Sequence, residues 1–253
     1  MSDKISVVII CKNEAGIIEK VVQSVLAVSD DVVVYDSGST DGTIDLLKKY
    51  RVQLHSGPWL GYGKTKQAAV ALARHGWILS LDADEAPDDI LQQELKSLSL
   101  LDSQTVYNLR FKNFLGHKWL RHGEWGGDQH IRLFHKDFAH WNDADIHETL
   151  LVPPGASVVT LKGYVQHFTV KDLAEYSRKV VHYALLNAEK YHRQGKRSTW
   201  LKRNLSPAFT FIKHYFFELG FLDGWEGFVS ARMTAFYTFL KYARLRELEQ
   251  ENG

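Results

Sequence analysis

The chain of 253 residues is long enough for one large domain or a domain with an extension, and its composition of 45% hydrophobic and 24% charged residues excludes wholesale disorder. The formal net charge of +1 gives no overall indication of nucleic-acid binding. The single cysteine, Cys11, excludes an internal disulfide and is typical of a reducing compartment.

The first hundred residues alternate between strand and helix patterns. Short apolar runs predict four strands, at 6–11, 31–35, 52–55 and 77–81. Apolar residues at helical spacing predict three helices between them, at 17–28, 43–50 and 64–75. Strands that are apolar on both faces and separated by helices indicate an α/β fold with a mainly parallel central sheet.

After about residue 100 the pattern changes. Residues 106–111 and 129–134 predict strands, and residues 157–168 predict a strand pair or one long strand. From about Leu173 the apolar spacing becomes helical. We therefore expect an α/β domain over residues 1–170 and a helical extension over residues 171–253. The sequence shows neither a signal-peptide pattern nor an apolar run of about 18 residues, so we expect no leader and no membrane span.

Two aspartates, Asp82 and Asp84, directly follow the predicted strand 77–81. Ligands of open parallel sheets bind beyond the carboxyl ends of the strands. Two such carboxylates can share Mg²⁺ or Mn²⁺, which takes a few carboxylates together with phosphate oxygens and water. The simpler interpretation is a solvated turn, so the pair needs the support of other motifs.

Two more polar loops follow predicted strands. Residues 36–43, Asp-Ser-Gly-Ser-Thr-Asp-Gly-Thr, offer carboxylates and hydroxyls that can hydrogen-bond a base and a ribose, and they equally suit a tight turn before a helix. Residues 12–14, Lys-Asn-Glu, follow the first strand and allow the same two interpretations. Three polar loops on one predicted sheet edge favour a binding site over three unrelated turns.

Residues 7–14, 36–41 and 82–84 together resemble the nucleotide-sugar half of family 2 glycosyltransferases. The resemblance implies a GT-A fold, a UDP-sugar donor, a divalent cation and an inverting reaction. The donor-binding and metal-binding residues that it implies are Asn13, Glu14, Asp36, Ser37, Lys66, Asp82 and Asp84. Among these, Asn13 and Asp36 would lie near the uridine, Lys66 near the diphosphate, Asp82 at the ribose or the metal, and Asp84 at the metal.

The whole chain is similar to bacterial lipopolysaccharide inner-core heptose β-1,4-glucosyltransferases, through residues 126–134 and 146–148 in particular. This similarity implies UDP-glucose as the donor and a heptose hydroxyl of the lipopolysaccharide core as the acceptor. It also implies a cytoplasmic enzyme that is peripheral on the inner face of the bacterial inner membrane. Transfer to another acceptor, such as a lipid-linked polysaccharide or a peptide, and a non-catalytic membrane adaptor with this fold are the alternative functions.

An inverting transfer needs a carboxylate that takes the proton of the acceptor hydroxyl. Asp128, in a glycine-flanked loop before a predicted strand, is our candidate, and Glu85 and Glu148 are the alternatives. The family's usual Glu-Asp pair is replaced here by Gly127-Asp128.

Two nearby basic residues each have more than one interpretation. His147 is either a third metal ligand or a hydrogen-bonded histidine that orders the acceptor loop. Arg132 would pair with Asp128, bind a phosphate or form a structural salt bridge.

The segment 190–217 contains seven Lys and Arg residues and several aromatic residues but no acidic residue. This composition is typical of an interfacial helix on an anionic membrane. The alternatives are aromatic packing on the catalytic domain or on a second subunit of a homo-oligomer, and a nucleic-acid surface, which no recognition motif supports. We favour the membrane because a lipid-linked acceptor is implied.

Overall fold

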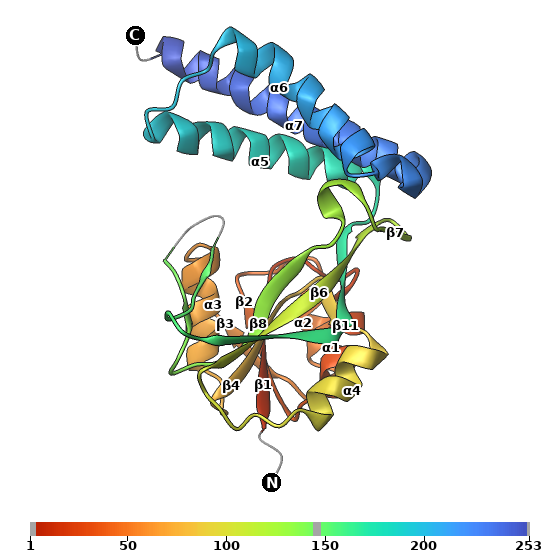
Figure 1. Ribbon diagram of the computed structural model, residues 1–253. Coiled ribbons are helices and arrows are strands. Elements are labelled where there is room, and N and C mark those ends of the chain that lie inside the picture. The colour runs from red at the N-terminus through yellow and green to blue at the C-terminus, as the bar shows by residue number, and fades with distance from the viewer. Residues whose placement is uncertain (1–3, 144–147, 252–253) are drawn as a thin grey trace. The chain divides into compact units, whose positions relative to one another are not determined.

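The computed structural model describes residues 4–143 and 148–251. The chain forms two compact units, one from residues 1–111 and 128–167 and the other from residues 112–127 and 168–253. Because the first unit contains most of the sheet, we call it the sheet unit, and we call the second the helical unit (Figure 1).

The first half of the sheet unit is parallel. Its strands lie in the order β3 (Gln53–Ser56), β2 (Asp31–Asp36), β1 (Ile5–Cys11) and β4 (Trp77–Asp82). Parallel neighbours require crossover connections, and helices supply them: α1 (Ile18–Leu26), α2 (Thr43–Leu47) and α3 (Tyr62–Ala71). Figure 1 shows α3 and α1 on opposite sides of these strands, which explains why the strands are buried throughout.

The sheet continues beyond β4 with antiparallel strands. The order is β8 (Gln129–His135), β6 (Thr105–Leu115), β11 (Ser157–Val170) and β5 (Glu85–Pro87), and β7 (Lys118–Leu120) also pairs with β6. The remaining elements of this unit are α4 (Asp89–Ser97) and the two-stranded pair of β9 (His140–Trp141) with β10 (Leu150–Leu151). The predicted α/β class with a parallel centre is confirmed.

Strand register brings three loops to one edge of the sheet. Ile10 of β1 lies opposite Asp82 of β4, and Cys11 lies opposite Asp36 of β2. The loops that follow β1, β2 and β4 therefore begin at the same level. This is the arrangement that the sequence predicts for the three polar loops.

The helical unit has its own core. Its elements are η1 (Gly123–Trp125), α5 (Leu173–Arg193), α6 (Trp200–Ile212), the π-helical turn η2 (Lys213–Phe217), the 3₁₀ turn η3 (Gly220–Asp223) and α7 (Gly224–Glu251). The long helix α7 packs against both α5 and α6. Apolar side chains from α5 and the neighbouring strands form the core, including Leu120, Val170 and Val180. None of the helices within the described ranges is long and apolar enough to cross a membrane.

Candidate functional site

The loops after β1 and β2 are tied together by hydrogen bonds. The amide oxygen of Asn13 accepts from the Thr40 N–H at 2.7 Å, and the Asn13 N–H donates to the Ser39 hydroxyl at 2.8 Å. The Glu14 N–H donates to Thr43 Oγ1 at 2.9 Å. Asn13 has a left-handed backbone with φ of 58°, which asparagine tolerates better than most residues. The structure therefore brings two of the three predicted loops into one rigid rim.

The buried carboxylate of Asp36 accepts hydrogen bonds from the loop that follows β2 and so fixes its conformation. Its Oδ1 accepts from the N–H groups of Gly38 and Ser39, both at 2.9 Å, and its Oδ2 accepts from the Ser39 hydroxyl. The adjacent Ser37 is also buried, and among the described residues none hydrogen-bonds its hydroxyl. An orphaned buried hydroxyl needs an explanation, and a bound ligand is one. Cys11 is buried, and burial together with Asp36 raises the pKa of its thiol.

The end of β4 carries a buried ion network. Lys66, on α3, is fully buried, and its Nζ lies 2.9 Å from Asp82 Oδ1 and 2.8 Å from Glu148 Oε1. The same ammonium group lies 4.7 Å from the ring centre of Trp141. Burying a lysine is costly unless it is paired, and Asp82 and Glu148 supply that pairing.

Arg132, on β8, extends the network. Its guanidinium lies 2.7 Å from Glu85 Oε1 and 3.3 Å from Asp82 Oδ2, so the structural salt bridge is confirmed. Burial opposes the charge on Asp82, but Lys66 and Arg132 hold its pKa below the usual range. For Glu85, burial raises the pKa although Arg132 opposes the shift.

Asp84 has a different partner, one that the sequence did not suggest. Its Oδ2 lies 3.5 Å from His167 Nε2 on β11. Burial disfavours the charged imidazole, yet the carboxylate of Asp84 raises the pKa of His167 to about 9. His167 lies in a strand that mixes polar and apolar residues, and nothing in the local sequence predicts which carboxylate faces it.

Asp128 precedes β8 and lies beside a histidine. Its Oδ1 is 2.9 Å from His130 Nε2. The His130 ring packs edge-on against Phe111, with ring centres 5.0 Å apart, and Phe111 in turn meets the ring of His167 at 6.1 Å. A chain of contacts thus connects Asp128 with the histidine that pairs with Asp84. The structure brings these two candidate residues, 44 positions apart in the sequence (128 − 84), into one region of the sheet unit.

The third predicted metal ligand, His147, lies outside the described residues. Within the described residues, no group of three or more His, Cys, Asp or Glu side chains gathers to hold a metal by itself. Mg²⁺ is usually bound through one or two carboxylates together with substrate phosphates and water, so two aspartates match its ordinary mode of binding.

Comparison with known proteins adds independent findings. A family model described as glycosyl transferase family 2 matches residues 6–95, which contain all three loops. The structure of S. aureus TarS 1-349 in complex with UDP aligns with 98% of this chain and 91% of its own, with 16% identity and a TM-score of 0.47. The M. tuberculosis glucosyl-3-phosphoglycerate synthase with Mn²⁺, UDP and phosphoglyceric acid aligns over 44% and 43%, with 25% identity and a TM-score of 0.35.

Two curated relatives match nearly the whole chain. A lipopolysaccharide core biosynthesis glycosyltransferase, LpsC of Rhizobium meliloti, is 28% identical over 248 residues, covering 95% of this chain and 91% of LpsC. An uncharacterized glycosyltransferase of Rickettsia bellii is 30% identical over 258 residues, covering 98% of this chain and 88% of the relative. With this coverage and the family-model match across the three loops, the chain belongs to the family 2 glycosyltransferases.

Proposed function

We propose that this enzyme transfers glucose from UDP-glucose to a heptose hydroxyl of the lipopolysaccharide inner core, with inversion and with a divalent cation. The observation that carries the proposal is the meeting of three polar loops, after β1, β2 and β4, at one edge of the parallel sheet. The similarity to LpsC, whose name states lipopolysaccharide core biosynthesis, supports this class of acceptor.

The proposed donor site is the rim formed by the first two loops. Asn13 and Glu14 fix the rim, and Asp36 holds the turn beside it. The buried Ser37 hydroxyl has no hydrogen-bond partner among the described residues, and we propose that the uridine supplies one. Lys66 forms ion pairs with Asp82 and Glu148 and adds positive charge near the proposed diphosphate position.

Asp84 and Asp82 fit a hard divalent cation as carboxylate ligands. The chemistry of the pair suits Mg²⁺ or Mn²⁺ when the diphosphate supplies further oxygens. Asp84 is the stronger candidate because it pairs with the single imidazole of His167, whereas Asp82 already pairs with both Lys66 and Arg132. When bound, the cation would supply charge neutralisation for the departing diphosphate.

Asp128 is the proposed base. Its side chain is 32% exposed, compared with 17% for Glu148 and 1% for Glu85, so it can reach an acceptor hydroxyl more readily. Glu148 and Glu85 are also held by the buried cations Lys66 and Arg132. In the proposed reaction, Asp128 takes the hydroxyl proton while the acceptor oxygen bonds to the anomeric carbon. The bond from that carbon to the phosphate oxygen breaks, and its electron pair leaves with UDP.

The deciding experiment is a transfer assay with a panel of UDP-sugars and a heptose-containing core lipid. We expect UDP-glucose to be used and EDTA to stop turnover until Mg²⁺ or Mn²⁺ is restored. Asp84→Ala should abolish transfer, and Asp128→Asn should lower kcat by about 10²–10⁴-fold without weakening UDP binding. Asp137→Asn, which removes an exposed carboxylate near the end of β8, is the matched control. Near-normal turnover by Asp84→Ala would overturn the metal assignment.

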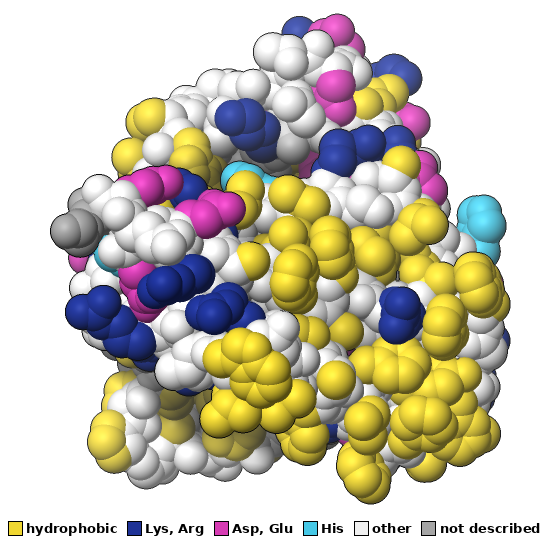
Figure 2. All heavy atoms as spheres, turned by 90° about the horizontal axis from the view of Figure 1, so that it is seen from above, with side chains coloured by type: hydrophobic (Ala, Val, Ile, Leu, Met, Phe, Trp, Pro, Cys, Tyr) yellow, Lys and Arg dark blue, Asp and Glu magenta, His cyan; other side chains and the backbone are white. Residues whose placement is uncertain are grey.

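We further propose that the helical unit contacts an anionic membrane. Large hydrophobic side chains are exposed along α6, η2, η3 and the start of α7: Trp200, Leu201, Leu205, Phe209, Ile212, Phe216, Phe217, Leu219, Phe221, Leu222 and Trp225. We call this set the apolar face. Figure 2 shows hydrophobic side chains gathered on one side of the molecule, with Lys and Arg side chains among and beside them. An exposed apolar area of this kind marks an interaction surface, and the basic groups suit anionic lipid.

A further inference from the structure

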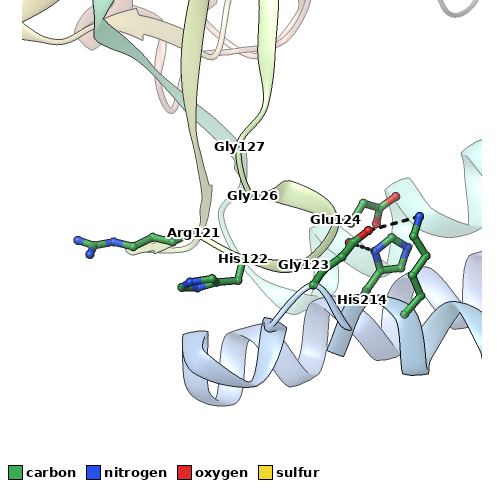
Figure 3. A pocket seen from close by; sticks show the side chains of 9 residues that line it. Arg121, His122, Gly123, Glu124, Gly126, Gly127 and His214 are labelled. Atoms are coloured by element: carbon green, nitrogen blue, oxygen red, sulfur yellow. Dashed lines mark hydrogen bonds and ion pairs between the residues drawn. The ribbon is translucent and has the colours of Figure 1, made fainter. Parts of the chain in front are cut away.

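Basic side chains of the helical unit differ in whether a carboxylate accompanies them. A cavity of about 600 Å³ is lined by residues of the loop 121–127 and of the turn Lys213–Phe217. In it, Lys213 and His214 both pair with Glu218, at 3.4 and 2.6 Å (Figure 3). The basic groups of this turn are therefore already paired. A second cluster in the same unit has basic groups without such partners.

The second cluster surrounds Lys241 of α7 with tyrosine rings. The Lys241 Nζ lies 4.9 Å from the ring centre of Tyr242, 5.0 Å from that of Tyr191 and 5.3 Å from that of Tyr237. The Nζ of Lys196 lies 3.9 Å from the ring centre of the same Tyr191. We call these five residues the lysine–tyrosine cluster. All of them belong to the helical unit, so their arrangement is independent of the sheet unit.

The local sequence fixes Lys196 against the tyrosine ring, because α5 ends in a Schellman motif. Gly195 has a positive φ of 68°, which glycine adopts without strain. Its N–H donates to the His192 carbonyl at 2.9 Å, and the Lys196 N–H donates to the Tyr191 carbonyl at 3.0 Å. These two bonds are the pair that defines the motif. They turn the chain back toward the last turn of α5 and so hold Lys196 beside Tyr191.

The next residues of the loop are anchored on α7. Ser198 is buried, its N–H donates to Glu249 Oε1, and its hydroxyl donates to the Tyr242 carbonyl, both at 2.7 Å. The guanidinium of Arg203 donates to the Ser198 carbonyl at 3.2 Å. The loop that carries Lys196 is therefore fixed against the helix that carries Lys241. Such preorganisation lowers the entropic cost of binding a ligand.

The two ammonium groups of the cluster lack a balancing carboxylate. Over the described ranges of the chain, neither Lys196 nor Lys241 forms an ion pair or a hydrogen bond through its ammonium group. Glu249, which anchors the loop, pairs instead with Arg246 at 3.6 Å. Lys241 is half-buried, and burial and the charge of Lys196 both lower the pKa of its ammonium group. Tyrosine faces attract a cation, but they do not offset the repulsion between two of them. A bound anion would offset it.

The chemistry of the cluster suits a phosphate group. Lysine binds phosphate as a point charge, and the oxygens of one phosphate can accept hydrogen bonds from both ammonium groups. A phosphate monoester carries nearly two negative charges at neutral pH, which two lysines match better than they match a diester or a carboxylate. We propose that Lys196 and Lys241 form a binding site for a phosphate monoester. Because the apolar face begins at Trp200, just after this loop, the phosphate belongs either to a lipid headgroup or to a soluble ester.

The first test is calorimetric titration with glycerol 3-phosphate, with UDP present to occupy the proposed donor site. We expect the double variant Lys196→Met, Lys241→Met to bind at least about tenfold more weakly than wild type, because each substitution removes a charged hydrogen-bond donor. The control is the double variant Lys118→Met, Arg178→Met, which removes two exposed cations from β7 and α5 and so changes the net charge equally. Glycerol 3-phosphate should raise the melting temperature of the wild type and the control but not of the cluster variant.

The second test separates the two sources of phosphate. Sedimentation compares phosphatidylcholine vesicles that contain phosphatidic acid, a monoester, with vesicles of equal surface charge that contain phosphatidylglycerol, a diester. A preference for phosphatidic acid that only the cluster variant loses would identify a lipid headgroup. Binding of glycerol 3-phosphate that only this variant loses, without a vesicle preference, would identify a soluble ester.

The inference goes beyond the proposed transfer reaction, and the two can fail separately. A normally folded cluster variant that stays within twofold of the control with both probes would overturn the phosphate site, even if transfer from UDP-glucose is robust. A selective loss in the cluster variant would support the site, whichever sugar donor the enzyme uses. The variant Phe217→Ser, Trp225→Ser, which alters only the apolar face, should still bind glycerol 3-phosphate as wild type does.

Discussion

Asp82 and Asp84 are two positions apart, but their surroundings give them different roles. Asp82 is held between the buried cations Lys66 and Arg132, whereas Asp84 forms its ion pair, within the described residues, with the imidazole of His167. A lysine or arginine left without its partner remains a buried charge, while a histidine can release its proton. The two aspartates should therefore differ in what they contribute to stability.

We expect Asp82→Asn to lower the free energy of unfolding by about 3–5 kcal/mol, because it breaks a buried ion pair from one side. Asp84→Asn should cost less than this, since His167 can become neutral when its partner is removed, whereas Lys66 and Arg132 remain charged. Urea denaturation of both variants in EDTA measures the difference. Equal losses would show that Asp84 is as much a part of the buried network as Asp82.

At the scale of elements, the connection between the loops after β1 and β2 depends on one residue with a left-handed backbone conformation. Asn13 combines a positive φ with a side chain that accepts from the Thr40 N–H. The backbone conformation and the hydrogen bond can be separated by substitution, because glycine adopts a positive φ freely and alanine does not. The loop therefore offers a matched pair of variants.

Asn13→Gly should lose only the hydrogen bond and destabilise the protein by about 1 kcal/mol. Asn13→Ala should lose about 1–2 kcal/mol more, because its Cβ atom strains the left-handed conformation. Chemical denaturation gives both values, and titration with UDP should show weaker binding for both variants. If the two variants are equally stable, the loop relaxes to a different backbone conformation.

At the scale of the whole molecule, the apolar face groups many large exposed hydrophobic side chains within residues 200–225. Trp225 is 69% exposed and Phe217 is 74% exposed, and both lie near the η2–η3 turn. Isolated exposed hydrophobic residues are ordinary, and Leu101 of the sheet unit, 87% exposed, is such a case. Leu101 is therefore a suitable control for the clustered residues.

We expect the double variant Phe217→Ser, Trp225→Ser to bind anionic vesicles about 100-fold more weakly than wild type, because two large apolar side chains no longer enter the lipid. Leu101→Ser should bind as wild type does. Flotation at low salt measures the binding, and light scattering measures the oligomeric state. A wild-type dimer that becomes monomeric in the double variant, with no vesicle binding by either, would identify the face as a subunit interface instead.

Much of the fold and part of the site were predictable. The strands around Val8 and Val33 are short apolar runs, and the loops that begin at Lys12, Asp36 and Asp82 are polar over consecutive residues. Such signals are local, since the periodicity of a segment depends only on its neighbours in sequence. Parallel strands then align their carboxyl ends, so the alternation of strands and helices already predicts that the three loops share one edge of the sheet.

Only the tertiary structure decided which distant side chains pair. Lys66 meets Glu148 across 82 positions, Arg132 pairs with Asp82 and Glu85, and His167 faces Asp84. The cavity between the loop 121–127 and the turn Lys213–Phe217 likewise joins segments that share no local pattern. The sequence by itself determined the fold class, the polar edge of the sheet and the family. Pairings of buried charges depend on how the strands and helices cross, and local periodicity carries no information about that.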